Sequence, residues 1–181
     1  MKGTETQIQN KFLKLLNKYK IDEIDVNMLC ESLNIRRQTF YYHYKNLYDV
    51  IYSVFYLKKM EPTNPKDLNK LLDDVINFLF EDENFNREIN DSNAKDILSN
   101  FLVSFLFHGL YIYLNRFKLG NETKREVGRF IANSAIGQIL YYFKDEELSK
   151  AEIKENIKAL VNNEVIEKLI STYKKSKLNV L

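Results

Sequence analysis

Polar and aromatic side chains crowd a short stretch between residues 36 and 46. The stretch reads RRQTFYYHYKN, and within it Phe40 has the character of a buried anchor. Arg and Gln can reach the edges of base pairs in the major groove of DNA. Thr, Tyr, His and Lys suit phosphate oxygens, whose contacts set register rather than sequence. The composition therefore predicts a helix that binds nucleic acid with most of its surface.

A second short helix is expected directly before this stretch. Asp25 suits its N-cap, because a carboxylate there accepts a hydrogen bond from an unpaired backbone N–H. Leu29, Cys30 and Leu33 form one apolar face, and Asn34 suits the left-handed residue that ends a helix. Two short helices joined by a turn of three or four residues are a helix-turn-helix.

Two further helices are needed to complete a small core around this motif. An amphipathic helix is expected over residues 4–20, where Ile8, Phe12 and Leu15 share a face. Asn46 suits the N-cap of the helix that follows the motif, with Asp49 three residues on in a loose capping-box relation. The start of that helix would also favour a phosphate.

The run TFYYHYKN at residues 39–46 resembles the signature of the tetracycline-repressor (TetR) family of transcription regulators. That signature is Thr, a hydrophobe, Tyr, any residue, His, an aromatic, any residue, Asn or Ser, and Lys. Three positions differ here: Asn34 replaces a small residue in the turn, Arg36 replaces Ser or Thr, and Leu47 replaces the final Lys. The resemblance covers roughly the first third of the chain, and the rest agrees with the family in helical layout.

The resemblance implies a homodimeric regulator that binds double-stranded DNA at a two-fold operator, and most commonly a repressor. A co-regulator that keeps the fold but binds a protein partner instead of DNA is the alternative, because Leu47 removes a charge contact. The predicted DNA contacts are Asn27, Arg36, Arg37, Gln38, Thr39, Tyr41, Tyr42, His43, Lys45 and Asn46. For His43, a purely structural role remains the alternative to phosphate binding.

Composition favours an all-α protein without enzymatic chemistry. The chain has 181 residues, 45% of them hydrophobic, with only 5 Gly and 2 Pro, which suits long helices. Residues 1–60 hold ten Lys and Arg against six Asp and Glu, and the remainder holds seventeen against nineteen. A basic head on a mildly acidic body suits nucleic-acid contact by the head. With two His and no Gly-rich phosphate loop, no catalytic site, metal or cofactor is expected.

A cytoplasmic location is expected. The single cysteine cannot form an internal disulfide and suits a reducing compartment. Cys30 is expected to pack as a small hydrophobe, with a redox sensor as the alternative. The N-terminal residues lack the apolar core of a signal peptide.

The clearest break in the chain lies at residues 58–65, which contain both prolines. We therefore expect a helix-turn-helix domain over 1–47, a connecting helix over 48–61 and a helical effector-binding and dimerisation domain over 62–181. The helices expected in the last domain cover 67–80, 84–90, 96–117, 124–144 and 149–173. Within the last of these, a kink is expected near residues 162–163, and Ser149 with Glu152 reads as a capping box.

The helix expected over 96–117 is apolar nearly all round. A membrane span is the alternative to a central bundle helix, which is favoured because polar residues interrupt the segment. Its excess of aromatic residues predicts a mostly apolar cavity for a small apolar effector. The predicted lining residues are Phe101, Phe105, His108 and Ile112, with His108 as the polar anchor. A core histidine bonded to a backbone carbonyl is the alternative for His108.

A two-fold dimer is expected through the helices over 124–144 and 149–173. Paired heads can bind successive faces of the major groove, which a single small head cannot do. The predicted interface residues are Ala132, Ala135, Ile136, Gly137, Ile139, Ile166 and Ile170. The alternative is that these residues only line the core of each chain.

Overall fold

The protein folds into helices, and within the described residues every regular element is helical. The computed structural model describes residues 3–58 and 60–178. Two compact units divide the chain: Met1–Lys59 with Glu83–Phe101, and Met60–Asp82 with Leu102–Leu181. The predicted all-α class is confirmed. One boundary lies at residues 59–60, inside the predicted break, but residues 83–101 cluster with the head instead of with the remainder of the predicted C-terminal domain.

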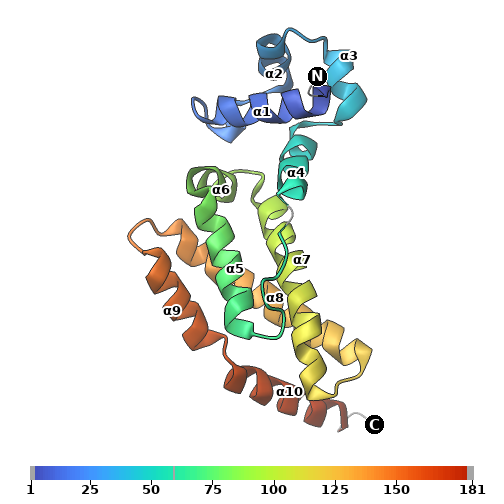
Figure 1. Ribbon diagram of the computed structural model, residues 1–181, viewed down its shortest axis with the longest axis vertical. Helices are drawn as coiled ribbons and strands as arrows, with labels where there is room; N and C mark the ends of the chain where they lie inside the picture. Colours follow the sequence, from blue (N-terminus) through green and yellow to red (C-terminus); the bar gives the residue numbers. More distant parts are fainter. Residues whose placement is uncertain (1–2, 59, 179–181) are drawn as a thin grey trace. The chain divides into compact units, whose positions relative to one another are not determined.

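The first unit, here called the head, is built around the two short helices of the motif. α1 packs against α2 and α4, and α2 packs against α3 (Figure 1). The head also includes the start of α7. The helices are α1 (Thr4–Leu16), the 3-10 turn η1 (Ile21–Glu23), α2 (Val26–Leu33), α3 (Arg37–His43), α4 (Leu47–Leu57) and α6 (Glu83–Asn90).

Local hydrogen bonds fix the ends of the short helices in the head. The carboxylate of Asp25 accepts from the Met28 N–H at 2.7 Å, and the side chain of Asn46 accepts from the Asp49 N–H at 3.0 Å. Asn34 ends α2 in the left-handed conformation, with φ 53° and ψ 43°. The three predicted caps are confirmed. Asp49 departs slightly from a capping box, because its carboxylate accepts from the N–H of Lys45 instead of Asn46.

The core of the head joins side chains from all its helices. Ile8, Phe12, Leu29 and Phe40 are completely buried. The ring of Phe55 contacts residues far along the chain: its centroid is 5.4 Å from that of Phe85 and 5.3 Å from that of Phe101. These aromatic contacts explain why residues 83–101 join the head.

The second unit, here called the body, contains the longer helices. α9 lies alongside α5, and α8 also packs against α9 (Figure 1). The chain breaks between α9 and α10 at Val161 and Asn162, next to the predicted kink, so two helices replace the single helix expected over 149–173. The helices are α5 (Leu68–Glu81), α7 (Lys95–Tyr113, from residue 102 onward), η2 (Leu114–Phe117), α8 (Asn121–Lys144), α9 (Lys150–Leu160) and α10 (Asn163–Leu178).

Capping and close packing define the body helices. Ser149 and Glu152 form the predicted capping box, and the hydrogen bonds from Ser149 lower the pKa of the Glu152 carboxyl. α8 begins three residues earlier than expected, at Asn121, and Gly120 lies at its N-cap. Gly109 on α7 allows close approach to α5, since a Cβ there would collide with the Leu71 side chain.

α7 with η2 is long and apolar enough to cross a membrane by length and composition alone. Its apolar window has a mean hydropathy of 1.6, and 44% of that window is buried inside the chain. The core helix of a soluble protein passes the same test. The buried side chains Leu102, Leu106 and Leu110 are spaced as one helix face, so α7 packs as a bundle helix.

Candidate nucleic-acid interface

α3 is held to the head by one deeply buried side chain and exposes most of the others. Phe40 is the only residue of the helix that is buried. Its ring packs edge-on against Tyr41, with centroids 5.4 Å apart. Tyr44, directly after the helix, is also buried and lies 5.9 Å from Phe40 by ring centroids. The sequence-based choice of Phe40 as the anchor is confirmed.

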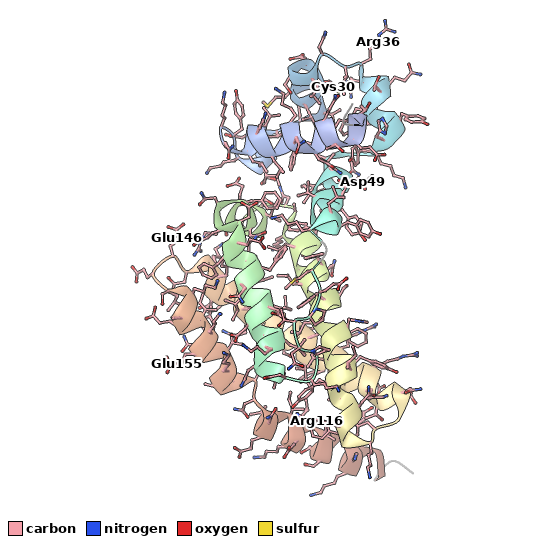
Figure 2. All side chains as sticks on the ribbon, in the orientation of Figure 1. Cys30, Arg36, Asp49, Arg116, Glu146 and Glu155 are labelled. Atoms are coloured by element: carbon pink, nitrogen blue, oxygen red, sulfur yellow. The ribbon has the colours of Figure 1, made fainter. Side chains whose placement is uncertain are left out.

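The predicted DNA contacts lie on the outside of the head. Tyr42 is 85% exposed, and Figure 2 shows Arg36 pointing outward at the edge of the head. Thr39 and His43 are partly exposed. The exposed members of the set are Asn27, Arg36, Arg37, Gln38, Tyr41, Tyr42, Lys45 and Asn46. The head therefore presents guanidinium, amide, ammonium and phenol groups on one short helix and its flanks.

Arg37 and Tyr41 contact each other on the exposed side of α3. The Arg37 Nη2 donates to the Tyr41 hydroxyl at 3.2 Å, and the guanidinium carbon lies 5.7 Å from the Tyr41 ring centroid. The hydrogen bond to Tyr41 raises the pKa of Arg37 above its usual value. A spacing of four residues places both side chains on the same helix face. Tyr41 thus restricts the orientation of a predicted base-reading side chain.

His43 contacts a carboxylate that sequence reasoning did not connect with it. Its Nδ1 lies 3.3 Å from Oε1 of Glu5 on α1. The His43 side chain is 18% exposed, whereas that of Glu5 is 63% exposed. The residues are 38 positions apart, so no local pattern could indicate the pair. This contact gives His43 a structural role that stands beside the predicted phosphate contact.

A polar cluster inside the head links α1, the end of α3 and α4. The Gln9 Nε2 donates to the Tyr44 hydroxyl and to the Ser53 Oγ, both at 3.0 Å. Ser53 in turn donates to the backbone carbonyl of Val50 at 2.7 Å. Buried polar groups need such partners to offset their lost hydration. The cluster fixes α4 against α3 and was not predicted, because the three residues are far apart in sequence.

Cys30 lies inside the head on α2. Its side chain is 3% exposed, and burial raises the pKa of its thiol. Leu29 beside it is completely buried. The burial agrees with the prediction that Cys30 packs as a small hydrophobe.

The predicted effector-binding residues all lie on α7 but differ in burial along it. Phe101 belongs to the head, where its ring stacks on Phe55. Phe105 and Ile112 belong to the body, with Phe105 buried and Ile112 partly exposed. His108 is exposed, so it is neither a core histidine nor the buried anchor of an enclosed cavity. The pattern of α7 concealed this, because apolar residues lie nearly all round that helix.

The predicted dimer residues mostly lie in the core of the body. Six of them are at most 4% exposed, and Gly137 is exposed. The structure therefore supports the alternative kept at the sequence level for those six, an intramolecular core. The six are Ala132, Ala135, Ile136, Ile139, Ile166 and Ile170.

The opposite side of α8 is exposed and partly aromatic. Phe130 is 59% exposed and Tyr141 is 71% exposed. Gly137 lies between them, and a Cβ added there would meet no atom within 4 Å. Asn133 and Ser134 complete the exposed face. This surface, rather than the buried residues, is the part of α8 that a partner could contact.

Comparisons with known proteins support the fold. No protein-family model and no curated protein matches the sequence. A solved structure described as "Dihydroxyacetone kinase operon activator DhaS" is similar, with a TM-score of 0.58 and 18% sequence identity. The similarity covers 93% of this chain and 97% of that chain. At this level of identity the similarity shows the fold, and the two chains share it over nearly their whole lengths.

Proposed function

We propose that this protein is a cytoplasmic, sequence-specific DNA-binding transcription regulator. The observation that carries the proposal is the placement of α3, a helix with one buried residue whose Arg, Gln and Tyr side chains are exposed. A helix with these side chains, following a helix and a tight turn, suits the major groove. The similar structure bears the name of an operon activator, and this name supports the regulatory class.

Each exposed group has a proposed role on DNA. Arg37 and Gln38 lie at the start of α3 and are the proposed readers of base edges, since both side chains can form paired hydrogen bonds with a purine. Lys45 and Tyr42 are the proposed phosphate contacts, which set the register of the head on the duplex. The N-terminus of α4 at Asn46 adds a backbone N–H site for a further phosphate.

A homodimer is the proposed DNA-binding form. One head buries little DNA surface, whereas two heads related by a two-fold axis can bind two half-sites together. The exposed face of α8, with Phe130 and Tyr141, is the proposed contact because interfaces are enriched in aromatic residues. It replaces the buried residues of the sequence-based prediction.

A gel-shift titration with the DNA upstream of the protein's own coding region tests the proposal. Arg37→Ala should relax sequence preference at one base pair and weaken cognate binding by about 1–3 kcal/mol. Lys45→Ala should weaken binding to cognate and random DNA about equally and lower the salt slope by about one. Lys18, an exposed lysine just after α1, gives the matched control Lys18→Ala, which should change neither the sequence preference nor the salt slope.

The pattern across these variants separates the possible outcomes. If the wild-type protein binds the upstream DNA no better than random DNA, specific recognition there is refuted. If Lys18→Ala lowers the salt slope as much as Lys45→Ala does, then the basic charge of the head, and not α3, carries the binding.

Repression is the proposed direction of regulation, and it rests on the resemblance of the sequence to the TetR family. The similar structure is named for an activator, so the direction needs its own measurement. A reporter fused to the bound promoter should rise when the gene for this protein is deleted. A fall in the reporter would assign activation instead.

A protein-binding co-regulator is the second candidate, and a feature of α4 favours it. Tyr48, Tyr52 and Tyr56 are exposed at successive four-residue intervals, and the α4 residues exposed beside them include Leu57 but no charged side chain. Tyr is enriched in protein interfaces. This candidate predicts that Tyr52→Ala abolishes regulation in the reporter while Arg37→Ala leaves regulation intact; DNA-binding predicts the reverse for Arg37.

A further inference from the structure

Two cavities in the body are lined mostly by polar side chains, but their hydrogen bonding differs. The first, here called the donor pocket, has a volume of about 460 Å³. It is formed by the segment before and at the start of α5, by η2 and by the start of α10. Its lining residues are Asn64, Lys66, Asp67, Leu68, Asn69, Arg116 and Asn163.

The second cavity, here called the paired pocket, has a volume of about 470 Å³, and several of its polar groups contact one another. The hydroxyl of Thr63 donates to the carboxylate of Asp74 at 2.9 Å. Lys154 donates to the Asn77 side-chain oxygen at 2.9 Å and lies 3.7 Å from the Asp73 carboxylate. Lys154 and the carboxylates of Asp73 and Asp74 therefore lie in one lining with opposite charges, which leaves little reason for an anion to bind.

In the donor pocket, internal hydrogen bonds occupy the side-chain oxygens of Asn64 and Asn163 and one carboxylate oxygen of Asp67. The side-chain oxygen of Asn64 accepts from the Lys66 backbone N–H at 3.1 Å. The side-chain oxygen of Asn163 accepts from the Tyr113 hydroxyl at 2.5 Å, at the short end of the range for O–H···O bonds. Asp67 uses its Oδ1 to cap α5, accepting from Asn69 N–H at 2.9 Å. Because each amide oxygen is held in this way, Asn64 and Asn163 present their NH₂ groups as donors.

Two cations complete the donor set. Arg116 lies with its guanidinium carbon 4.9 Å from the ring centroid of the buried Tyr113. Among the described residues, no carboxylate lies within ion-pair distance of Arg116. Tyr113 therefore supports the guanidinium through its ring and Asn163 through its hydroxyl, so one buried side chain positions both groups. Lys66 adds an exposed ammonium. Arg116, labelled in Figure 2, lies in η2 just after the C-terminal end of α7.

The surrounding helices add to the same positive field. α5 begins at Leu68 and α10 begins at Asn163, and both residues line the donor pocket. Helix N-termini carry partial positive charge. A lining with two cations, two oriented NH₂ groups and one carboxylate already used as a cap favours a ligand with several acceptor oxygens and negative charge.

We propose that the donor pocket binds a small organic phosphate. A phosphate monoester offers three charged oxygens to Arg116, Lys66 and the two amides, and multiple donors around one group are typical of phosphate recognition. The volume lies within the range for small-molecule sites, so the pocket holds an organic group besides the phosphate. The effector that the aromatic residues of α7 predicted is apolar; this ligand is polar and binds elsewhere in the body.

Isothermal titration calorimetry with the purified full-length chain tests this site, using glycerol 3-phosphate as the probe. Wild-type protein should bind it more tightly than inorganic phosphate or citrate, and should not bind glycerol. Arg116→Gln keeps a polar side chain but removes the charge and should weaken binding about tenfold or more.

The most specific variants are Asn64→Asp and Asn163→Asp. Each keeps the oxygen that accepts the internal hydrogen bond but replaces the donor NH₂ by a second carboxylate oxygen, so each should abolish detectable binding. Asn156→Asp is the matched control: it introduces the same charge at an exposed position of α9 outside both pockets and should leave binding unchanged. Circular dichroism of each variant confirms that the helices persist.

Three results would overturn the proposal. The first is that wild-type protein gives no heat of binding. The second is that Asn163→Asp binds glycerol 3-phosphate as tightly as wild type does. The third is that wild-type protein binds inorganic phosphate as tightly as it binds the ester. If both Asp variants lose helical content, the test rests on Arg116→Gln alone. Binding of glycerol 3-phosphate by Arg116→Gln as tight as by wild type would then refute the site. The titration contains no DNA, so its failure leaves the proposed DNA-binding function untouched.

Discussion

α3 and α8 both expose aromatic side chains, but they relate to the core in opposite ways. α3 has seven residues, of which only Phe40 is buried. α8 has twenty-four residues and buries nine, including Ala135, Ile136 and Ile139. α3 therefore contributes little to the core relative to its exposed surface, whereas α8 buries one face along its length and exposes the other. The difference separates a helix that is mostly exposed from a helix that packs one whole face into the core.

The largest expected effect tests whether α3 depends on a single anchor. Phe40→Ala should lower the free energy of unfolding by about 3–5 kcal/mol, because a fully buried Phe loses its apolar contacts and leaves a cavity. Chemical denaturation followed by circular dichroism measures the change. Tyr42→Ala on the same helix is the control and should change stability by less than about 0.5 kcal/mol. Similar losses in the two variants would contradict the single-anchor description.

The next test addresses the buried side of α8. Ile136→Ala should lower the free energy of unfolding by about 2–5 kcal/mol, since Ile136 is completely buried. Other buried side chains of α8 also hold the helix in the core, so the loss of unfolding free energy should lie toward the lower end of that range. Tyr141→Ala, on the exposed face, is the paired control with little expected change. A large loss for Tyr141→Ala with none for Ile136→Ala would reverse the assignment of the two faces.

A third prediction concerns how α3 begins. Arg36 lies at its N-cap without a side-chain capping bond. Arg36→Ser should stabilise the head by about 1 kcal/mol through a new hydrogen bond to an N–H of the first turn. The same change should weaken DNA binding if Arg36 contacts DNA. Gly120→Ser at the start of α8 should add only a few tenths of a kcal/mol, because glycine is already a tolerable N-cap.

The last prediction tests association and involves only a small change in stability. Gly137→Glu should stabilise the isolated chain by roughly 0.5 kcal/mol, because glycine is a poor helix former and the site is open. The same substitution should dissociate the dimer, since it places a charge on the proposed contact face. Sedimentation velocity measures this, with Asn100→Glu on α7 as the exposed control. A Gly137→Glu protein that remains dimeric at micromolar concentration would refute contact through this face.

Local sequence patterns were sufficient to predict the ends of helices, where one residue type determines the backbone conformation. Asp25 and Asn46 cap their helices as predicted, and Asn34 adopts the left-handed conformation that ends α2. The break near residue 162 and the Ser149 capping box also follow from neighbouring residues. These features depend on contacts within four positions, which a single sequence displays directly.

Local patterns were insufficient to predict the buried face of a helix that has apolar residues on more than one side. α8 carries small and apolar residues on its buried face and aromatic residues on its exposed face, so residue type alone did not show which side faces the core. His108 gave the same difficulty on α7. Clusters of residues that are distant in sequence could not be predicted from these patterns either. The Gln9, Tyr44 and Ser53 cluster and the donor pocket each join segments that only the folded chain brings together.

The buried thiol of Cys30 allows the opening of the head to be timed chemically. It is the only cysteine in the chain, so a thiol reagent has no competing target. Because burial shields the sulfur and raises its pKa, the reagent must wait for a local opening that exposes α2. When reclosing is fast, the ratio of the observed labelling rate to that of an unfolded peptide gives the free energy of this opening. Bound DNA should slow the labelling in proportion to its occupancy of the head.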